Sequence, residues 1–227
     1  MIGRSPDTPR TMGRSYGRAP RGEPGSGMSL EVIERPLEDP KVRRCILRIL
    51  GRNQLCAIAT VTSRGGAYIN SAYFAYTPDL VFYFYSYPDT RHAVNLRANS
   101  SMAMAVFDSG QAWGRPDRGL QLFGAARAAV GPSARTAERT YDRRFPDHAA
   151  WKAPVVTDES AAPPRAFQFR PTTVKLFDER AFGAGIFVRA AIPRRRATET
   201  PATGASSRLT PRQLQVLACS DASEPAS

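Results

Sequence analysis

One segment of the chain, residues 82–96, joins an apolar strand to a helix start that carries anion-binding side chains. The aromatic run Phe82–Ser86 is typical of a strand, and a helix should open at Asp89–Thr90. Arg91 and His92 then fall in the first turn of that helix. Because a helix N-terminus has unpaired N–H groups and a partial positive charge, these side chains predict a phosphate site. An ordinary capped helix with a surface Arg and His is the alternative that the segment leaves open.

The rest of the sequence offers no other catalytic or metal-binding pattern. It has no carboxylate pair, nucleophile triad, glycine-rich phosphate loop or zinc motif, and its two histidines, His92 and His148, exclude a histidine-rich metal site. The three cysteines, Cys45, Cys56 and Cys219, lack metal-type spacing and fit free thiols in a reducing cytoplasm. Any redox chemistry must therefore come from a bound cofactor.

Composition bounds the class of protein. The 227 residues are 42% hydrophobic, enough for one sizeable domain, and no long apolar run predicts a membrane span. The formal net charge of +12 favours an anionic ligand. The same charge leaves a nucleic-acid-associated basic protein as an alternative from another class, although a genome rich in Arg codons explains the arginine content equally well.

Three regions follow from the distribution of apolar residues. Residues 1–27 are rich in Gly, Pro, Ser and Arg and are expected to be disordered, with Met28 as the natural start. Residues 28–191 should form the folded domain, and residues 192–227 a disordered tail. Within that tail Leu209–Leu217 resembles the opening helix of LuxR-type DNA-binding domains without the remaining helices, so we expect a short amphipathic helix or a reading-frame accident.

The folded region has the pattern of short strands joined by tight turns, with few helices. Asp39 and Pro40 should begin a helix that Gly51 ends. Further helices are expected over 90–98 and 133–145, and strands over 55–62, 67–76, 80–86, 102–108, 120–130, 166–177 and 182–190. Six or seven antiparallel strands of this kind predict a mainly β fold, a β-barrel with flanking helices.

The strand expected over 80–86 has two apolar faces. Tyr83 and Tyr85 share one face, and Phe82 and Phe84 share the other. One face should line the barrel core. The other face must be covered by a helix, a ligand or a second subunit, which is the first indication of a homodimer.

A series of short motifs runs through the folded region in a fixed order. They are Leu55-Cys-Ala-Ile-Ala-Thr60, Gly66-Ala-Tyr-Ile-Asn-Ser-Ala-Tyr-Phe74, Phe82 through Leu96, Asn99-Ser100, Leu120-Gln-Leu-Phe-Gly124, Phe167-x-x-x-Pro171, Lys175-Leu-Phe-Asp178 and Phe182-Gly183. Their order resembles the FMN-binding split barrels of the pyridoxamine 5′-phosphate oxidase-like superfamily over about residues 40–190. The Asp-Thr-Arg-His form at residues 89–92 is most similar to the uncharacterised YhbP-like branch.

In proteins of that superfamily FMN lies in a cleft between two subunits. The resemblance therefore implies a split barrel that forms a homodimer, binds FMN and acts on a small-molecule substrate. Carried over by position, Thr90, Arg91 and His92 would hold the phosphate. The resemblance also implies flavin contacts from Tyr85 and Ser86 along the ribityl chain and ring, from Asn70, Ser71, Ala72 and Tyr73 at the ring edge, and from Gln121 on the neighbouring strand or partner subunit.

Two positions depart from the related oxidases, which have Lys where His92 stands and often Arg where Asn70 stands. Because an imidazole is charged only part of the time near neutral pH, phosphate binding should depend on pH. In the true oxidases a C-terminal Trp and an Arg-x-His motif hold pyridoxamine phosphate. Neither has a clear counterpart after Phe182, so that substrate is not expected. Deazaflavin and haem stay open as alternative cofactors, because some split barrels bind them.

Two residues outside the motifs were weighed for function. Trp113 could cap a flavin or substrate, but packing on its own barrel is the interpretation we favour. His148 is expected to be structural. The sequence thus predicts an FMN-dependent oxidoreductase acting on a small organic molecule. A non-catalytic flavin, deazaflavin or haem binding or sensor protein of the same fold is the alternative.

Overall fold

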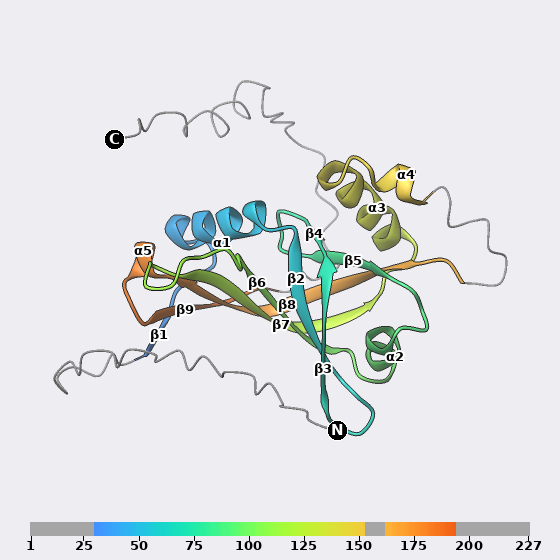
Figure 1. Cartoon of the computed structure of the whole chain (residues 1–227), viewed down its shortest axis with the longest axis horizontal. Helices are drawn as coiled ribbons and strands as arrows, with labels where there is room; N and C mark the ends of the chain where they lie inside the picture. The colour runs from blue at the N-terminus through green and yellow to red at the C-terminus, as the bar shows by residue number, and fades with distance from the viewer. Residues whose placement is uncertain (1–29, 153–161, 194–227) are drawn as a thin grey trace, which may run out of the picture. The chain divides into compact units, whose positions relative to one another are not determined.

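The computed structural model of the chain describes residues 30–152 and 162–193, and all the elements below lie within these residues (Figure 1). Outside the described residues lie the predictions for 1–27, Met28, Leu209–Leu217, Cys219 and nearly all of the tail 192–227.

Strands dominate the described residues, which confirms the predicted mainly β fold. The helices are α1 (Pro40–Arg52), α2 (Arg91–Ala98), α3 (Pro132–Arg144), α4 (His148–Lys152) and α5 (Glu179–Phe182). The strands are β1 (Glu31–Glu34), β2 (Leu55–Val61), β3 (Ala67–Tyr73), β4 (Ala75–Tyr76), β5 (Phe82–Ser86), β6 (Ser101–Phe107), β7 (Arg118–Ala128), β8 (Arg165–Asp178) and β9 (Ile186–Ala191). Among the described residues, none of the helices combines the length and the apolarity that crossing a bilayer requires.

Helix α1 forms where the sequence predicts it. The Asp39 carboxylate accepts from the N–H groups of Lys41 and Val42, which satisfies two of the unpaired donors at the helix start. Its apolar face is buried over the barrel. The helix passes Gly51 and ends at Arg52, after which the Asn53 side chain donates to the Ile49 carbonyl at 2.8 Å. Its buried residues are Val42, Cys45, Ile46, Ile49 and Leu50.

The strands form one sheet in the order β1-β9-β8-β7-β6-β2-β3, and the long strand β8 divides it. One edge of β8 pairs along its length with β7, while the other pairs first with β5 and then with β9. Pro171 lies between these two pairings and has no N–H to donate. Opposite it, a Cβ on Gly124 would lie 2.3 Å from the Arg170 carbonyl oxygen, so only glycine fits at this irregularity in the ladder.

Strand β5 has two buried faces, as its sequence predicts. Phe82 and Phe84 join the main core, while Tyr83 packs in a second cluster with Ala137 and Tyr141 of α3. Helix α3 of the same chain lies beside β4 and β5 (Figure 1) and covers that second face. The two-sided aromatic strand therefore gives no reason for a second subunit.

The structure differs from the predicted strands in three places. Within residues 30–152 and 162–193 there are nine strands instead of six or seven, because β1 pairs with β9 in parallel and β4 is separate from β3. The strand predicted from Phe182 begins at Ile186. The Asp178 carboxylate accepts from the Ala181 N–H and starts the short helix α5 there, and Gly183 and Gly185, both with positive φ, then turn the chain into β9.

Candidate functional site

The end of β5 and the start of α2 bring three polar side chains together. Ser86 Oγ lies 2.6 Å from His92 Nε2 and 2.9 Å from Thr90 Oγ1. Thr90 Oγ1 lies 3.3 Å from His92 Nε2 and donates to the Tyr87 carbonyl at 2.8 Å. Since each hydroxyl has one proton, the three shortest contacts are satisfied when His92 Nε2–H donates to Ser86, Ser86 donates to Thr90 and Thr90 donates to Tyr87. We call these three side chains the α2 cluster.

The α2 cluster leaves the helix N-terminus open. Thr90 is the N-cap residue, yet its side chain makes no cap hydrogen bond because the hydroxyl turns back to Tyr87. The N–H groups of residues 91–93 are therefore not capped by Thr90 and offer donors and a partial positive charge to an anion. The helix itself is fixed, since Asn95 Nδ2 donates to Thr60 Oγ1 at 3.0 Å and both residues are buried.

Two basic residues follow the N-cap. Arg91 is exposed and makes no hydrogen bond or ion pair with the described residues. His92 is half-buried, with its ring centroid 6.3 Å from that of Phe84, and desolvation lowers the pKa of its imidazole below the ordinary value of 6.5. His92 is thus neutral at pH 7 in the protein alone, and an anion beside it would favour its charged form.

Strand β3 supplies a second polar feature. Asn70 and Ala72 face the inner side of the sheet, and Asn70 Nδ2 donates to the Ser71 carbonyl at 3.2 Å. Asn70 Oδ1 is buried and has no hydrogen-bond partner among the described residues. A buried acceptor left unpaired costs about 1–3 kcal/mol, so this oxygen is suited to a ligand that brings an N–H or O–H donor.

Tyr85, predicted beside Ser86 at the flavin, lies on the opposite face of β5. Its ring packs edge-on against Tyr141 of α3, with centroids 4.8 Å apart. Burial, helped by nearby carboxylates, raises the pKa of the Tyr85 hydroxyl to about 12. The structure therefore gives Tyr85 a packing role under α3 and does not bring its side chain to the α2 cluster.

The other predicted contacts, Ser71, Tyr73 and Gln121, point outward from the sheet. They belong to a surface that we call the outer face, formed by the outward side chains of four neighbouring strands, β3, β2, β6 and β7. Cross-strand register places these side chains side by side, and those named below are uncharged, although Arg127 continues the same side of β7 and Lys175 of β8 is the register partner of Gln121. The outer face consists of Ile69, Ser71, Tyr73, Ala57, Ala59, Val61, Ala103, Ala105, Phe107, Gln121 and Phe123.

Sequence reasoning missed Asn95 and was wrong about Trp113. Asn95 anchors α2. Its position between the apolar residues Ala93 and Leu96, both buried, was the sequence signal that could have revealed it. Trp113 does not pack on its own barrel, because it is fully exposed to solvent, at 102%. His148 is structural as predicted: it is buried and pairs with the Asp142 carboxylate at 2.7 Å.

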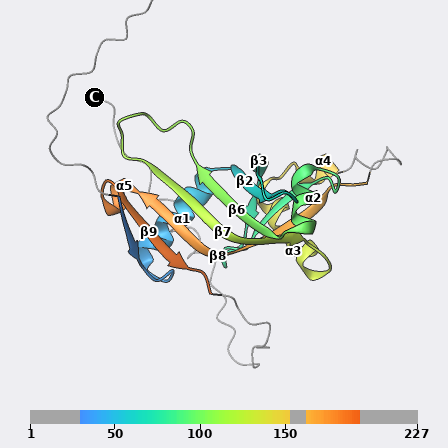
Figure 2. The ribbon, with the colours of Figure 1, turned by 90° about the horizontal axis from the view of Figure 1, so that it is seen from below.

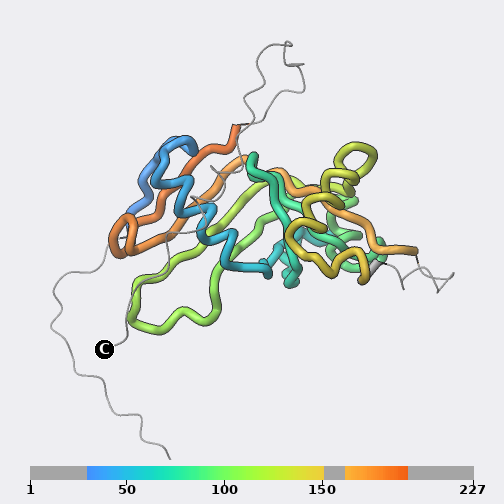
Figure 3. Tube along the Cα trace, turned by 90° about the horizontal axis from the view of Figure 1, so that it is seen from above, coloured from blue at the N-terminus to red at the C-terminus, as the bar shows by residue number. Residues whose placement is uncertain are grey.

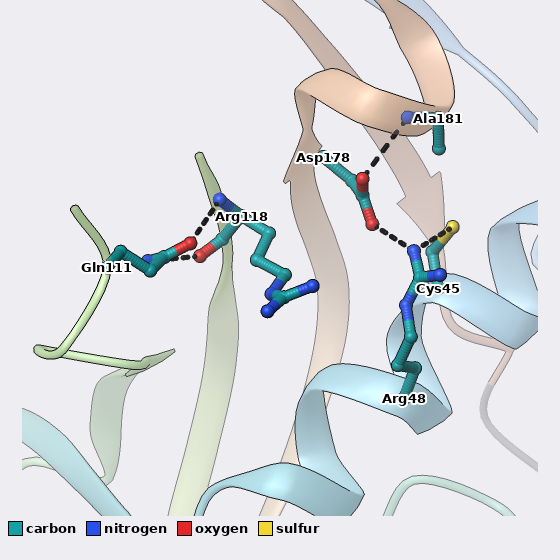
Figure 4. Close-up of polar contacts among 6 residues, drawn as sticks. All are labelled: Cys45, Arg48, Gln111, Arg118, Asp178 and Ala181. Carbon is teal, nitrogen blue, oxygen red and sulfur yellow. Dashed lines mark hydrogen bonds and ion pairs between the residues drawn. The ribbon is translucent and has the colours of Figure 1, made fainter. Parts of the chain in front are cut away.

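The buried polar groups at the other end of the barrel are structural. Asp178 is buried, starts α5 and forms an ion pair with Arg48 of α1 at 2.6 Å (Figure 4). The neighbouring Cys45 is a buried free thiol whose pKa is raised by burial and by Asp178. Burial also raises the pKa of Cys56 to about 12, so neither thiol is a reactive nucleophile. The described residues contain no grouping of His, Cys, Asp and Glu that could hold a metal.

The fold is a divided β-sheet barrel with an open, basic helix start at α2 and a half-buried Asn70 on β3, and comparison with known proteins identifies the family. The family model of pyridoxamine 5′-phosphate oxidase matches residues 42–178, so the chain belongs to that family. None of the curated proteins matches the chain.

Two solved structures show the same fold. A protein of unknown function from Agrobacterium tumefaciens, Atu2129, is 21% identical, with a TM-score of 0.50 over 63% of this chain and 59% of that one. A heme binding protein from Mycobacterium smegmatis is 14% identical, with a TM-score of 0.50 over 63% of this chain and 55% of that one. The chain thus spans less than two thirds of the length of either protein.

Proposed function

We propose that the chain binds FMN at the start of α2 and acts, as a homodimer, as an oxidoreductase on a small organic molecule. The observation that carries this proposal is the α2 cluster beside an uncapped helix N-terminus, within the segment that the family model matches. Helix N–H groups and the free guanidinium of Arg91 would bind the phosphate, and the Thr90 hydroxyl would join them by turning away from the Tyr87 carbonyl. His92 would add a proton to the same site.

The residues on β3 fit a flavin. The unpaired Asn70 Oδ1 matches the ring N–H donor of an oxidised flavin, and Ala72 leaves room on the same inner side of the strand. When bound, FMN supplies the two-electron redox chemistry that the side chains lack. The chain would bind the phosphate, orient the ring and exclude water from it.

The outer face supports the proposed dimer. The earlier argument, from the two apolar faces of β5, no longer applies because α3 covers one of them. The exposed apolar side chains of the outer face include Ile69 (69%), Tyr73 (58%) and Phe107 (52%). Such patches on soluble proteins mark interaction sites. Ser71, Tyr73 and Gln121 lie on this face, so contacts predicted for them would be made to the partner subunit's cofactor or to the partner subunit itself.

A haem or deazaflavin protein of the same fold is the second candidate. His92 is the imidazole at the α2 cluster, and its lowered pKa keeps it neutral, as an axial ligand must be, but its Nε2 is engaged by Ser86 at 2.6 Å and is not free to bind iron. The basic charge also keeps a nucleic-acid-associated protein as an alternative from another class. Both alternatives predict weak FMN binding.

Titration of the purified chain with FMN and with riboflavin tests the proposal. Quenching of flavin fluorescence reports binding of either molecule. We expect FMN to bind at least tenfold more tightly than riboflavin, since losing charge-assisted hydrogen bonds to the phosphate costs about 1.5–3 kcal/mol. Equal affinities would refute the phosphate site, and tight haem binding without flavin binding would favour the second candidate.

A further inference from the structure

The β6–β7 hairpin, residues 108–117, presents a single large aromatic side chain to solvent. Trp113 is 102% exposed, and the hairpin projects beyond the sheet in two views (Figures 2 and 3). A fully exposed Trp is costly in water and is the residue type most enriched at binding hot spots. The hairpin thus has the form of an interaction element.

The hairpin is ordered before any partner binds. The Gln111 side chain donates to the Arg118 carbonyl at 3.0 Å and accepts from the Arg118 N–H at 2.8 Å, which closes its base (Figure 4). Asp108 caps the turn at Gly110, with Oδ1 accepting at 2.8 Å. The Glu179 carboxylate accepts from the N–H of Asp117 at 2.9 Å, which ties the end of the hairpin to α5. Preorganisation of this kind lowers the entropic cost of association.

An apolar hollow of about 260 Å³ lies at the opposite end of the same strands. It opens on the outer face where β6 begins and β2 ends. The hairpin follows the other end of β6, so the length of β6 separates the two. The lining of the hollow includes Gly124 at the irregularity of the ladder, where a side chain would collide with the β8 backbone. Its lining is Ala59, Thr60, Val61, Gly65, Ala67, Ser101, Met102, Ala103, Phe123 and Gly124.

We propose that in the dimer Trp113 of each subunit packs into this hollow on the second copy of the chain. A two-fold axis that lies in the plane of the interface, perpendicular to β6, stacks the two outer faces with their β6 strands antiparallel. Each hairpin then meets the hollow of the partner. The hollow is uncharged and large enough for one indole ring. The inference rests on the dimer of the proposed function and names the residue that anchors it.

The exposed area is consistent with a stable interface. Trp113, Phe107, Phe123, Ile69 and Tyr73 are between 44% and 102% exposed, and their side chains together offer on the order of 600–700 Å². A standard interface needs about 800 Å² from each partner, which the small residues between these side chains would complete.

Tryptophan emission and sedimentation of one set of variants test the inference. With Trp151, the chain's other tryptophan, changed to Phe, the emission comes from Trp113 alone. As concentration rises and the dimer forms, that emission should shift to the blue. Trp113→Ala should weaken self-association roughly 30-fold or more, the scale of an interface hot spot. Ala103→Leu fills the hollow and should weaken self-association to a similar extent.

Val130→Ala is the matched control, because Val130 is 73% exposed in the turn before α3 and is not part of the outer face. It should leave self-association unchanged, and circular dichroism should show all variants folded. A dimer in which Trp113 still emits as an exposed indole, or in which Ala103→Leu has no effect, would overturn the inference. FMN titration of the same samples distinguishes failure of this inference from failure of the proposed function. Tight FMN binding by such a dimer, or by a monomer, would support the cofactor site even though the inference had failed.

Discussion

Affinity for FMN should rise as the pH falls from about 8 to 6.5, because His92 takes up a proton when the phosphate binds. Burial holds the pKa of His92 below 6.5 in the protein alone, and a phosphate dianion would raise it. Between these two pKa values binding takes up a proton, so the dissociation constant decreases with decreasing pH. One proton changes affinity by at most about tenfold per pH unit, which gives roughly 10- to 30-fold over this range.

His92→Lys is the informative variant, because lysine keeps its charge over the whole range. Its FMN affinity should vary with pH only through the phosphate itself, whose second pKa is about 6 and which acts equally on both proteins. Flavin fluorescence quenching at a series of pH values measures both profiles, with riboflavin as the ligand that lacks the phosphate. Superimposable profiles for wild type and His92→Lys, or an equal pH dependence for riboflavin, would refute a role of His92 in phosphate binding.

Three further outcomes are expected. Arg91→Ala should weaken FMN binding by about 1.5–3 kcal/mol and leave riboflavin binding unchanged, with the exposed Arg135→Ala as control in the same titration. Gly124→Ala should lower the free energy of unfolding in urea by at least about 3 kcal/mol, because its Cβ would lie 2.3 Å from the Arg170 carbonyl oxygen. Without FMN, stability should fall as the pH drops below about 6.5, since the unfolded chain protonates His92 first; His92→Gln should reduce this loss in thermal melts.

Local sequence signals predicted most of the fold. Asp39 and Pro40 marked the start of α1, and the alternation in Phe82–Ser86 assigned its two faces correctly. Strand β1 escaped prediction, because a short segment that pairs in parallel with β9, far along the chain, has no local turn to mark it. The start of β9 was misjudged because Asp178 caps a helical turn at a place where the sequence continues to look like a strand.

The candidate site was predicted in part. Ser86, Thr90 and His92 meet because a strand end and a helix start are adjacent in sequence, so local reasoning was sufficient. The alternation along β5 already placed Tyr85 on the face opposite Ser86, but it did not reveal that α3, from about fifty residues further along the chain, covers that face. The exposure of Trp113 depended on a hairpin that extends past the sheet, which hydrophobicity alone does not reveal.

The visible absorption spectrum of the purified chain, before and after incubation with FMN and removal of the free cofactor, tests the central claim most directly. The account predicts the two-banded spectrum of oxidised flavin at one FMN per subunit, and its loss in Arg91→Ala under conditions where wild type retains it. A Soret band in its place, or a spectrum without any visible band after incubation, would contradict an FMN site at the start of α2.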